Sequence, residues 1–144
     1  MPIPLEAEQI CELNFPAKAE RLGLMRTLVK CAAEQAGCNN HLSEKLVIAL
    51  NEACMNVIQH AYNREDGSSG EMSLKILKNG RHLYFRLQDF APPIDLNNVK
   101  PRDLDDVRPG GLGVHFIREI MDDCEMGHLE RGSGNYLEMT KIIE

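Results

Sequence analysis

The sequence contains no Trp, no low-complexity segment and no apolar run long enough to cross a bilayer. Its 144 residues are 43% hydrophobic and 26% charged, which is typical of a globular protein. The opening segment, MPIPLEAEQICELNF, lacks the basic and apolar regions of a secretory signal. We therefore expect a single domain over residues 1–144, located in the cytoplasm and without a membrane span.

Signatures of metal and nucleic-acid binding are also absent. The five Cys are scattered and include no CxxC pair, and the five His form no HExxH motif. We therefore expect reduced thiols and no structural metal. The net charge of −6 would repel a phosphate backbone, and Lys and Arg form no basic stripe, so we expect no nucleic-acid partner.

The spacing of apolar residues predicts the helices. A weakly alternating strand is expected over residues 8–14, followed by a helix from residue 16 to about 36 that ends at Gly37. A second helix should begin after Ser43 as its N-cap and continue to about residue 62. A third should extend from residue 112 to about 123. The residues expected to pack on the core are Leu46, Leu50, Ala53, Val57 and Ala61 on the second helix and Leu112, Phe116, Ile117, Ile120 and Met121 on the third.

Two hairpins are predicted between and after these helices. Residues 71–89, EMSLKILKNGRHLYFRLQD, alternate on both sides of the turn former Asn79-Gly80. CEMGHLER and NYLEMTKIIE form the second hairpin, joined at GSG. Residues 90–111 hold four of the seven Pro and no periodicity, which predicts a long loop. We expect its residues 90 to about 108 to act as a lid. These elements predict an α+β fold, a two-layer α/β sandwich with about three helices on one face of a mixed, mainly antiparallel sheet.

Polar residues on the second helix form the first candidate site. Glu52, Asn56 and His60, in NEACMNVIQHAY, are spaced four residues apart and would form a ridge along one side of an α-helix. Small neighbours such as Ala53 and Cys54 would leave room for a ligand. The alternative is a solvated helix edge, because periodic polar residues commonly mark an exposed face.

A glycine-rich segment and an acidic strand end form the other two candidate sites. In RPGGLGVHF, Gly110, Gly111 and Gly113 lead directly into the third helix, where free N–H groups favour an anion such as phosphate. The segment is neither a Walker A loop nor a Rossmann fingerprint, and an ordinary loop-to-helix junction is the alternative. Asp89 closes a predicted strand in DFAPPID and is either a turn former or a ligand-binding residue.

Together these segments resemble the GHKL, or Bergerat-fold, ATP-binding proteins. NEACMNVIQHAY resembles their N box, DFAPPID and GGLGVHFIREIMD their first and second glycine boxes, and GSGNYLEMTK their closing strand. The similarity covers residues 15 to 143 and is greatest to the compact anti-sigma-factor serine/threonine kinases.

This resemblance implies a fold of the Bergerat type and specific roles for the candidate residues. It implies that Glu52 is a general base, that Asn56 coordinates Mg²⁺ beside ATP, and that Asp89 accepts a hydrogen bond from the adenine amino group. The backbone implied to hold the phosphates is that of Gly110, Gly111, Leu112 and Gly113. A packing role for His60 under the loop is an alternative to a role at the site.

The resemblance also implies a reaction and partners. A kinase of this type transfers the γ-phosphoryl group of Mg·ATP to a Ser or Thr of a small anti-sigma-factor antagonist, with a sigma factor as a further partner and a homodimer as a suitable assembly. The alternative is a nucleotide-binding module that regulates a partner by sequestration. Ala91 and Pro92, in a box where the family commonly has Asp-x-Gly, favour that alternative, whereas Glu52 favours the kinase.

Overall fold

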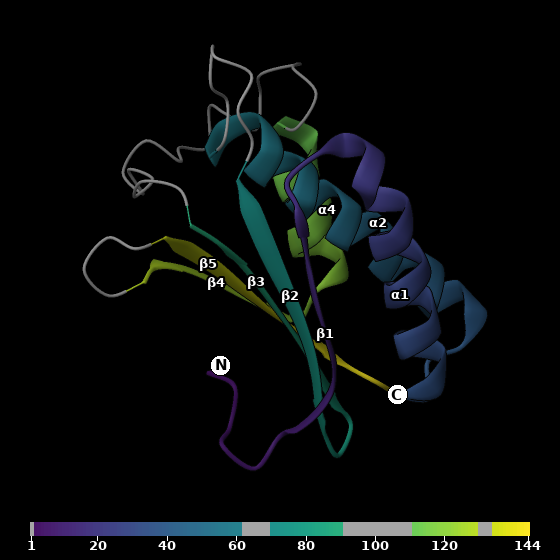
Figure 1. The fold of residues 1–144 in the computed structure, drawn as a ribbon. Coiled ribbons are helices and arrows are strands. Elements are labelled where there is room, and N and C mark those ends of the chain that lie inside the picture. Colours follow the sequence, from purple (N-terminus) through teal and green to yellow (C-terminus); the bar gives the residue numbers. More distant parts are fainter. Residues whose placement is uncertain (1, 62–69, 91–110, 130–133) are drawn as a thin grey trace.

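The computed structural model describes residues 2–61, 70–90, 111–129 and 134–144, which form two layers (Figure 1). The strands are β1 (Glu8–Pro16), β2 (Glu71–Asn79), β3 (His82–Asp89), β4 (Asp123–His128) and β5 (Asn135–Ile142). The helices are α1 (Leu22–Gln35), α2 (Asn40–Asn56) and α4 (Gly111–Ile120), with a 3-10 turn η1 (Ala19–Arg21) before α1 and a π-helical turn η2 (Val57–Ala61) after α2. Among the described helices, none is long and apolar enough to cross a membrane.

The strands form one sheet in the order β1-β2-β3-β5-β4. The three α-helices cover one face of this sheet (Figure 1). This arrangement confirms the predicted α+β sandwich and both predicted hairpins. The sheet was expected to be mixed, but every pairing among the described strands is antiparallel.

The core lies between the sheet and the helices. Alternate residues of β2 and β3 are almost completely buried there, because a strand directs every second side chain to the same face. These residues are Met72, Leu74 and Ile76 on β2 and Leu83, Phe85 and Leu87 on β3. On α2, Leu46, Leu50 and Ala53 are buried as predicted. In η2, Val57 packs only partly against the core, and the side chain of Ala61 lies outside the described residues.

The first helix begins later than predicted and ends where it was predicted to end. β1 continues through Pro16, which pairs with Glu71. Because β1 is an edge strand, the missing N–H of Pro16 is tolerated there, and the helix begins later than expected. At the other end, Gly37 has a φ of +109° and closes a Schellman motif, in which the N–H of Cys38 donates to the carbonyl of Ala33 at 3.0 Å.

The predicted N-cap of α2 at Ser43 is wrong. The helix begins four residues earlier, where the side-chain oxygen of Asn39 accepts a hydrogen bond from the N–H of Leu42 at 2.8 Å. Ser43 is completely buried on the same side as Leu46 and Leu50. Ser43 therefore lies within the helix and does not cap it, and its hydroxyl oxygen is buried without a hydrogen-bond partner among the described residues.

The first hairpin turns one residue later than predicted. Asn79 pairs with His82, so the turn residues are Gly80 and Arg81. Gly80 has a φ of +61°, which suits the first central position of a primed hairpin turn. The register with Asn79-Gly80 as the turn would also direct the apolar residues of both strands to the core, so alternation alone does not distinguish the two.

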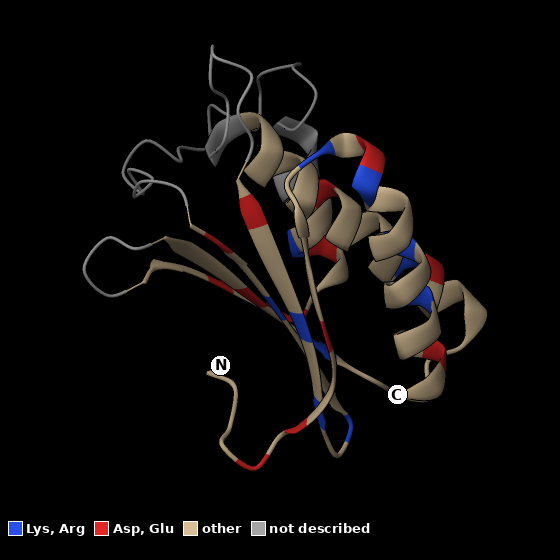
Figure 2. Cartoon of the chain, in the orientation of Figure 1, with Lys and Arg blue, Asp and Glu red and all other residues tan. Residues whose placement is uncertain are grey.

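The face of the sheet that points away from the helices carries polar and aromatic residues. Arg86 forms an ion pair with Glu138 and lies 4.6 Å from the ring centroid of Tyr136. The Tyr136 ring covers Gly127, where an added Cβ would lie 2.5 Å from the ring. Elsewhere on the described surface, acidic and basic residues are interspersed over helices and strands (Figure 2).

Candidate functional site

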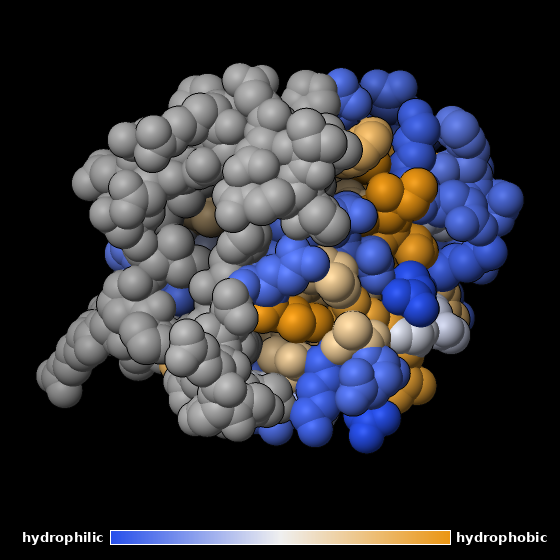
Figure 3. Space-filling view, turned by 90° about the horizontal axis from the view of Figure 1, so that it is seen from above, coloured by the Kyte–Doolittle hydropathy of each residue, from blue (hydrophilic) through white to orange (hydrophobic). Residues whose placement is uncertain are grey.

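The predicted site residues belong to elements that meet at one end of the molecule. The C-terminal ends of α2 and β3 and the N-terminal end of α4 all lie at the upper end in Figure 1. α2 also packs against α4. Figure 3 looks onto this end and shows hydrophobic residues near the centre of the described surface, with hydrophilic residues around them. The fold therefore directs three separate sequence motifs toward one region.

Glu52 and Asn56 lie one turn apart on α2, and both are half-buried. The side-chain oxygen of Asn56 is shielded from solvent and has no hydrogen-bond partner within the described part of the chain. Such an unsatisfied oxygen calls for an explanation, because buried polar atoms are nearly always paired. A carboxamide oxygen is a hard ligand that suits Mg²⁺. The side-chain oxygen of Asn56 could therefore serve as one ligand of a Mg²⁺ ion whose other ligands come from phosphate and water.

The helix changes its geometry directly after Asn56. Residues Val57–Ala61 form the π-helical turn η2, which is wider than an α-helical turn. The predicted ridge assumed α-helical spacing as far as His60. The side chain of His60 lies outside the described residues, so its place on the ridge stays a prediction. π-helical turns are rare and occur frequently at functional sites. The π-helical turn is therefore a further indication that the C-terminal end of α2 belongs to a functional site.

Asp89 is the last residue of β3 and is only 3% exposed. Opposite it on β5 lies Asn135, whose side-chain nitrogen donates a hydrogen bond to Asp89 Oδ1 at 2.9 Å. The side-chain oxygen of Asn135 is 2.9 Å from Nδ1 of His128. Burial of a carboxylate requires such hydrogen-bond donors, so this arrangement exceeds what a turn former needs.

Sequence reasoning missed Asn135 and His128, although it included Asn135 in the segment GSGNYLEMTK. Only the pairing of β3 with β5 reveals their role, because it brings together Asp89 and Asn135, which are 46 residues apart in the chain. Gly134 makes this approach feasible: it has a φ of +152°, and a Cβ there would lie 2.0 Å from the carbonyl oxygen of Asp89.

The glycine-rich segment leads into α4 as predicted, and the helix begins at Gly111. Gly111, Leu112 and Gly113 therefore occupy its first turn, where backbone N–H groups lack partners within the helix. Gly110 lies outside the described residues, as do Ala91, Pro92 and the rest of the predicted lid after Phe90.

The buried side of α4 is narrower than predicted. Ile117 and Met121 are buried, in agreement with the prediction. Phe116 is 45% exposed, so the expectation that it packs on the core is wrong. Ile120 packs partly against the core, so among the side chains of α4 that the structure describes, Phe116 is the predicted core residue that does not. The side chain of Leu112 lies outside the described residues.

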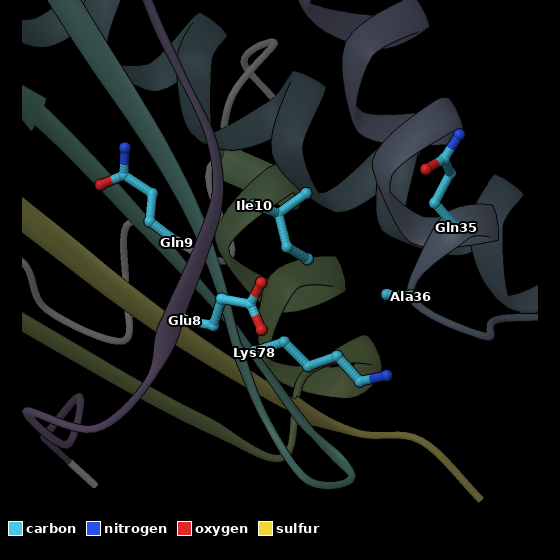
Figure 4. A pocket seen from close by; sticks show the side chains of 6 residues that line it. All are labelled: Glu8, Gln9, Ile10, Gln35, Ala36 and Lys78. Atoms are coloured by element: carbon cyan, nitrogen blue, oxygen red, sulfur yellow. The ribbon is translucent and has the colours of Figure 1, made fainter.

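A concave region lies at the opposite end of the sheet from the predicted site (Figure 4). It has a volume of about 280 Å³, and its lining residues are Glu8, Gln9, Ile10, Gln35, Ala36 and Lys78. Lys78 is six residues along β2 from Met72, the partner of Asp89, which corresponds to about 20 Å. This hollow is therefore separate from the predicted site. Within the described ranges, no cluster of three His, Cys, Asp or Glu residues could hold a metal ion.

Comparisons with known proteins agree with this geometry. The chain is 31% identical to the serine-protein kinase RsbW of Bacillus pumilus, over 96% of the chain and 88% of the relative. It is 33% identical to RsbW of Halalkalibacterium halodurans, over 92% of the chain and 83% of the relative.

A solved structure shares the fold. The Acinetobacter baumannii histidine kinase AdeS superimposes with a TM-score of 0.52 at 12% identity, over 92% of this chain and 68% of that one. The sequence profile of the histidine kinase-like ATPase domain matches residues 15–141. These matches confirm the resemblance that the sequence motifs predicted. The chain therefore belongs to the histidine kinase-like ATPase domain family.

Proposed function

We propose that the protein is a cytoplasmic serine/threonine kinase that uses Mg·ATP to phosphorylate a small anti-sigma-factor antagonist. Membership of the ATPase domain family supports the use of ATP, and the relatives named serine-protein kinases support the phosphoryl acceptor. The observation that carries the proposal is the buried, unpartnered side-chain oxygen of Asn56, one helical turn from the carboxylate of Glu52.

In the proposed site, Asn56 Oδ1 would hold Mg²⁺ together with the ATP phosphates, and the bound ion would supply neutralisation of the phosphate charge. Glu52 lies four residues earlier on α2, about 6 Å along the helix axis, and accepts the proton of the incoming hydroxyl. Asp89 accepts a hydrogen bond from the adenine amino group. The backbone N–H groups of the first turn of α4 donate to phosphate oxygens.

The rest of the proposal concerns organisation and partners. Residues 1–144 act as one catalytic domain, a sigma factor is the second partner, and the kinase works as a homodimer. The second candidate function is a nucleotide-binding module that sequesters its partner without catalysis. It is favoured by Ala91, which stands where the family commonly has the Gly of Asp-x-Gly, and by Pro92, which follows it and restricts the backbone of Ala91.

Two measurements test the proposal. Calorimetry with ATP, with and without Mg²⁺, should detect binding that depends on the metal. Transfer of ³²P from γ-labelled ATP to a candidate antagonist should occur with the wild type and be slowed in Glu52→Gln. The matched control is Glu44→Gln, because Glu44 lies on the same helix but pairs with Lys30 at 2.8 Å on the surface. Absence of binding at millimolar ATP would refute both functions, and binding without transfer would leave the sequestration module.

A further inference from the structure

We propose that Asn135 and His128 determine the selectivity of the nucleotide site for adenine by holding the carboxylate of Asp89 in one orientation. This inference rests on the proposed function, in which Asp89 contacts the adenine amino group. Neither residue touches the nucleotide in this proposal. Both are positioning residues that act through Asp89.

The chemistry of the three groups defines the direction of each hydrogen bond. A carboxylate only accepts, so the Asn135 amide must direct its NH₂ group toward Asp89 Oδ1, 2.9 Å away. The amide oxygen of Asn135 then faces His128 Nδ1, also 2.9 Å away, so this ring nitrogen must carry the proton. His128 opposes flipping of the amide in addition to Asp89, because a flipped amide would direct its NH₂ group at the Nδ1 proton of His128 as well as its oxygen at the carboxylate.

Burial strengthens the hydrogen bond between Asn135 and Asp89, whereas the hydrogen bond between His128 and Asn135 lies near the surface and can be removed by substitution. Asp89 and Asn135 are 3% and 5% exposed, so their charge-assisted hydrogen bond is shielded from competing water. His128 is exposed near the end of β4, where a substitution disturbs little packing. Gly134 seats the start of β5 directly against the backbone of Asp89. The carboxylate is thus constrained by both backbone and side chain.

A fixed carboxylate distinguishes purines by their 6-substituent. The adenine amino group donates a hydrogen bond to it, whereas a base without that group cannot make this bond. If the carboxylate could rotate, it could find other donors or water when the base lacks the amino group. The preference for adenine would then decrease. Removing the Asn135 amide or the His128 donor should therefore weaken selectivity more than it weakens nucleotide affinity in general.

The test compares the affinity for ATP with that for purine riboside 5′-triphosphate, which lacks only the 6-amino group. Calorimetry in Mg²⁺ should show that the wild type prefers ATP. In Asn135→Ala this preference should fall roughly tenfold, the scale of one hydrogen bond to a charged group. His128→Leu should reduce the preference several-fold. His128→Asn, whose amide nitrogen can occupy the place of Nδ1, should restore it.

The control is Met126→Leu, because Met126 is an exposed residue two positions from His128 on the same strand. It should leave the preference unchanged. If Asn135→Ala does not fold, the two His128 variants decide the question. An unchanged preference in His128→Leu, or a reduced preference in His128→Asn, would overturn the inference while leaving the kinase intact. A wild type that binds neither nucleotide would instead overturn the proposed function itself.

Discussion

Replacing Asn56 with Leu should make the free protein at least as stable as the wild type while removing its Mg²⁺-dependent affinity for ATP. Leu has nearly the same shape as Asn but no polar atoms. In the free protein the side-chain oxygen of Asn56 is buried without a partner among the residues that the structure describes. A residue retained at a cost to stability indicates a role that appears only when a ligand is bound.

The magnitude follows from the cost of an unsatisfied buried polar atom, which is about 1–3 kcal/mol. Because Asn56 as a whole is only half-buried, we expect the lower end, a gain of about 1 kcal/mol in the free energy of unfolding. In a chain of 144 residues this gain raises Tm by about 3 °C. Nucleotide at about 100 times its Kd adds about 2.7 kcal/mol to the wild type. In the Asn56→Leu variant, Mg²⁺ should not increase the stabilisation that the nucleotide provides.

The assay is thermal unfolding followed by circular dichroism, with no ligand, with ATP alone and with Mg·ATP. Asn51→Leu is the control: Asn51 lies on the same helix and accepts a hydrogen bond from Arg26 at 2.9 Å, so it should lose a little stability and keep the full Mg·ATP shift. A loss of 1 kcal/mol or more in Asn56→Leu would mean that the amide is satisfied in the free protein. A full Mg·ATP shift in that variant would mean that Asn56 is not the metal ligand.

Two further variants and two measurements on Cys54 test the site and the packing of the protein. Glu52→Gln should bind Mg·ATP with nearly normal affinity in calorimetry but transfer phosphate about 10²-fold more slowly, the scale of losing a general base, and a normal rate would exclude that role. Gly127→Ala should lower stability to urea by about 1–3 kcal/mol, because its Cβ would lie 2.5 Å from the ring of Tyr136; an unchanged urea midpoint would contradict this packing. Burial raises the pKa of the Cys54 thiol from 9.0 to about 12, so at pH 8 an alkylating reagent followed by mass spectrometry should label the exposed Cys31 first. Because the unfolded chain loses the Cys54 proton above pH 9 while the folded protein keeps it, this thiol should reduce stability by up to about 1.4 kcal/mol per pH unit between pH 9 and 12.

The sequence by itself determined the elements and the side of each that faces the core. Alternation in residues 71–89 identified the buried faces of β2 and β3, and helical spacing identified Leu46 and Leu50 on α2. These predictions succeed because the periods of a strand and a helix are local properties, and burial of apolar surface acts on each element in the same way. Sequence motifs likewise identified the candidate residues Glu52, Asn56 and Asp89.

Only the tertiary structure decided how these elements meet. Strand alternation does not change when a register shifts by two residues, so it did not place the turn at Gly80 and Arg81. Nor did it reveal that Asp89 faces Asn135, because β3 and β5 are joined through α4 and β4 and no local turn sets their register. The unpartnered oxygen of Asn56 is also invisible in a motif, because the lack of a partner depends on everything packed around it. Local periodicity predicts which side of an element is buried, whereas the pairing of distant polar atoms is set by the packing of the whole chain.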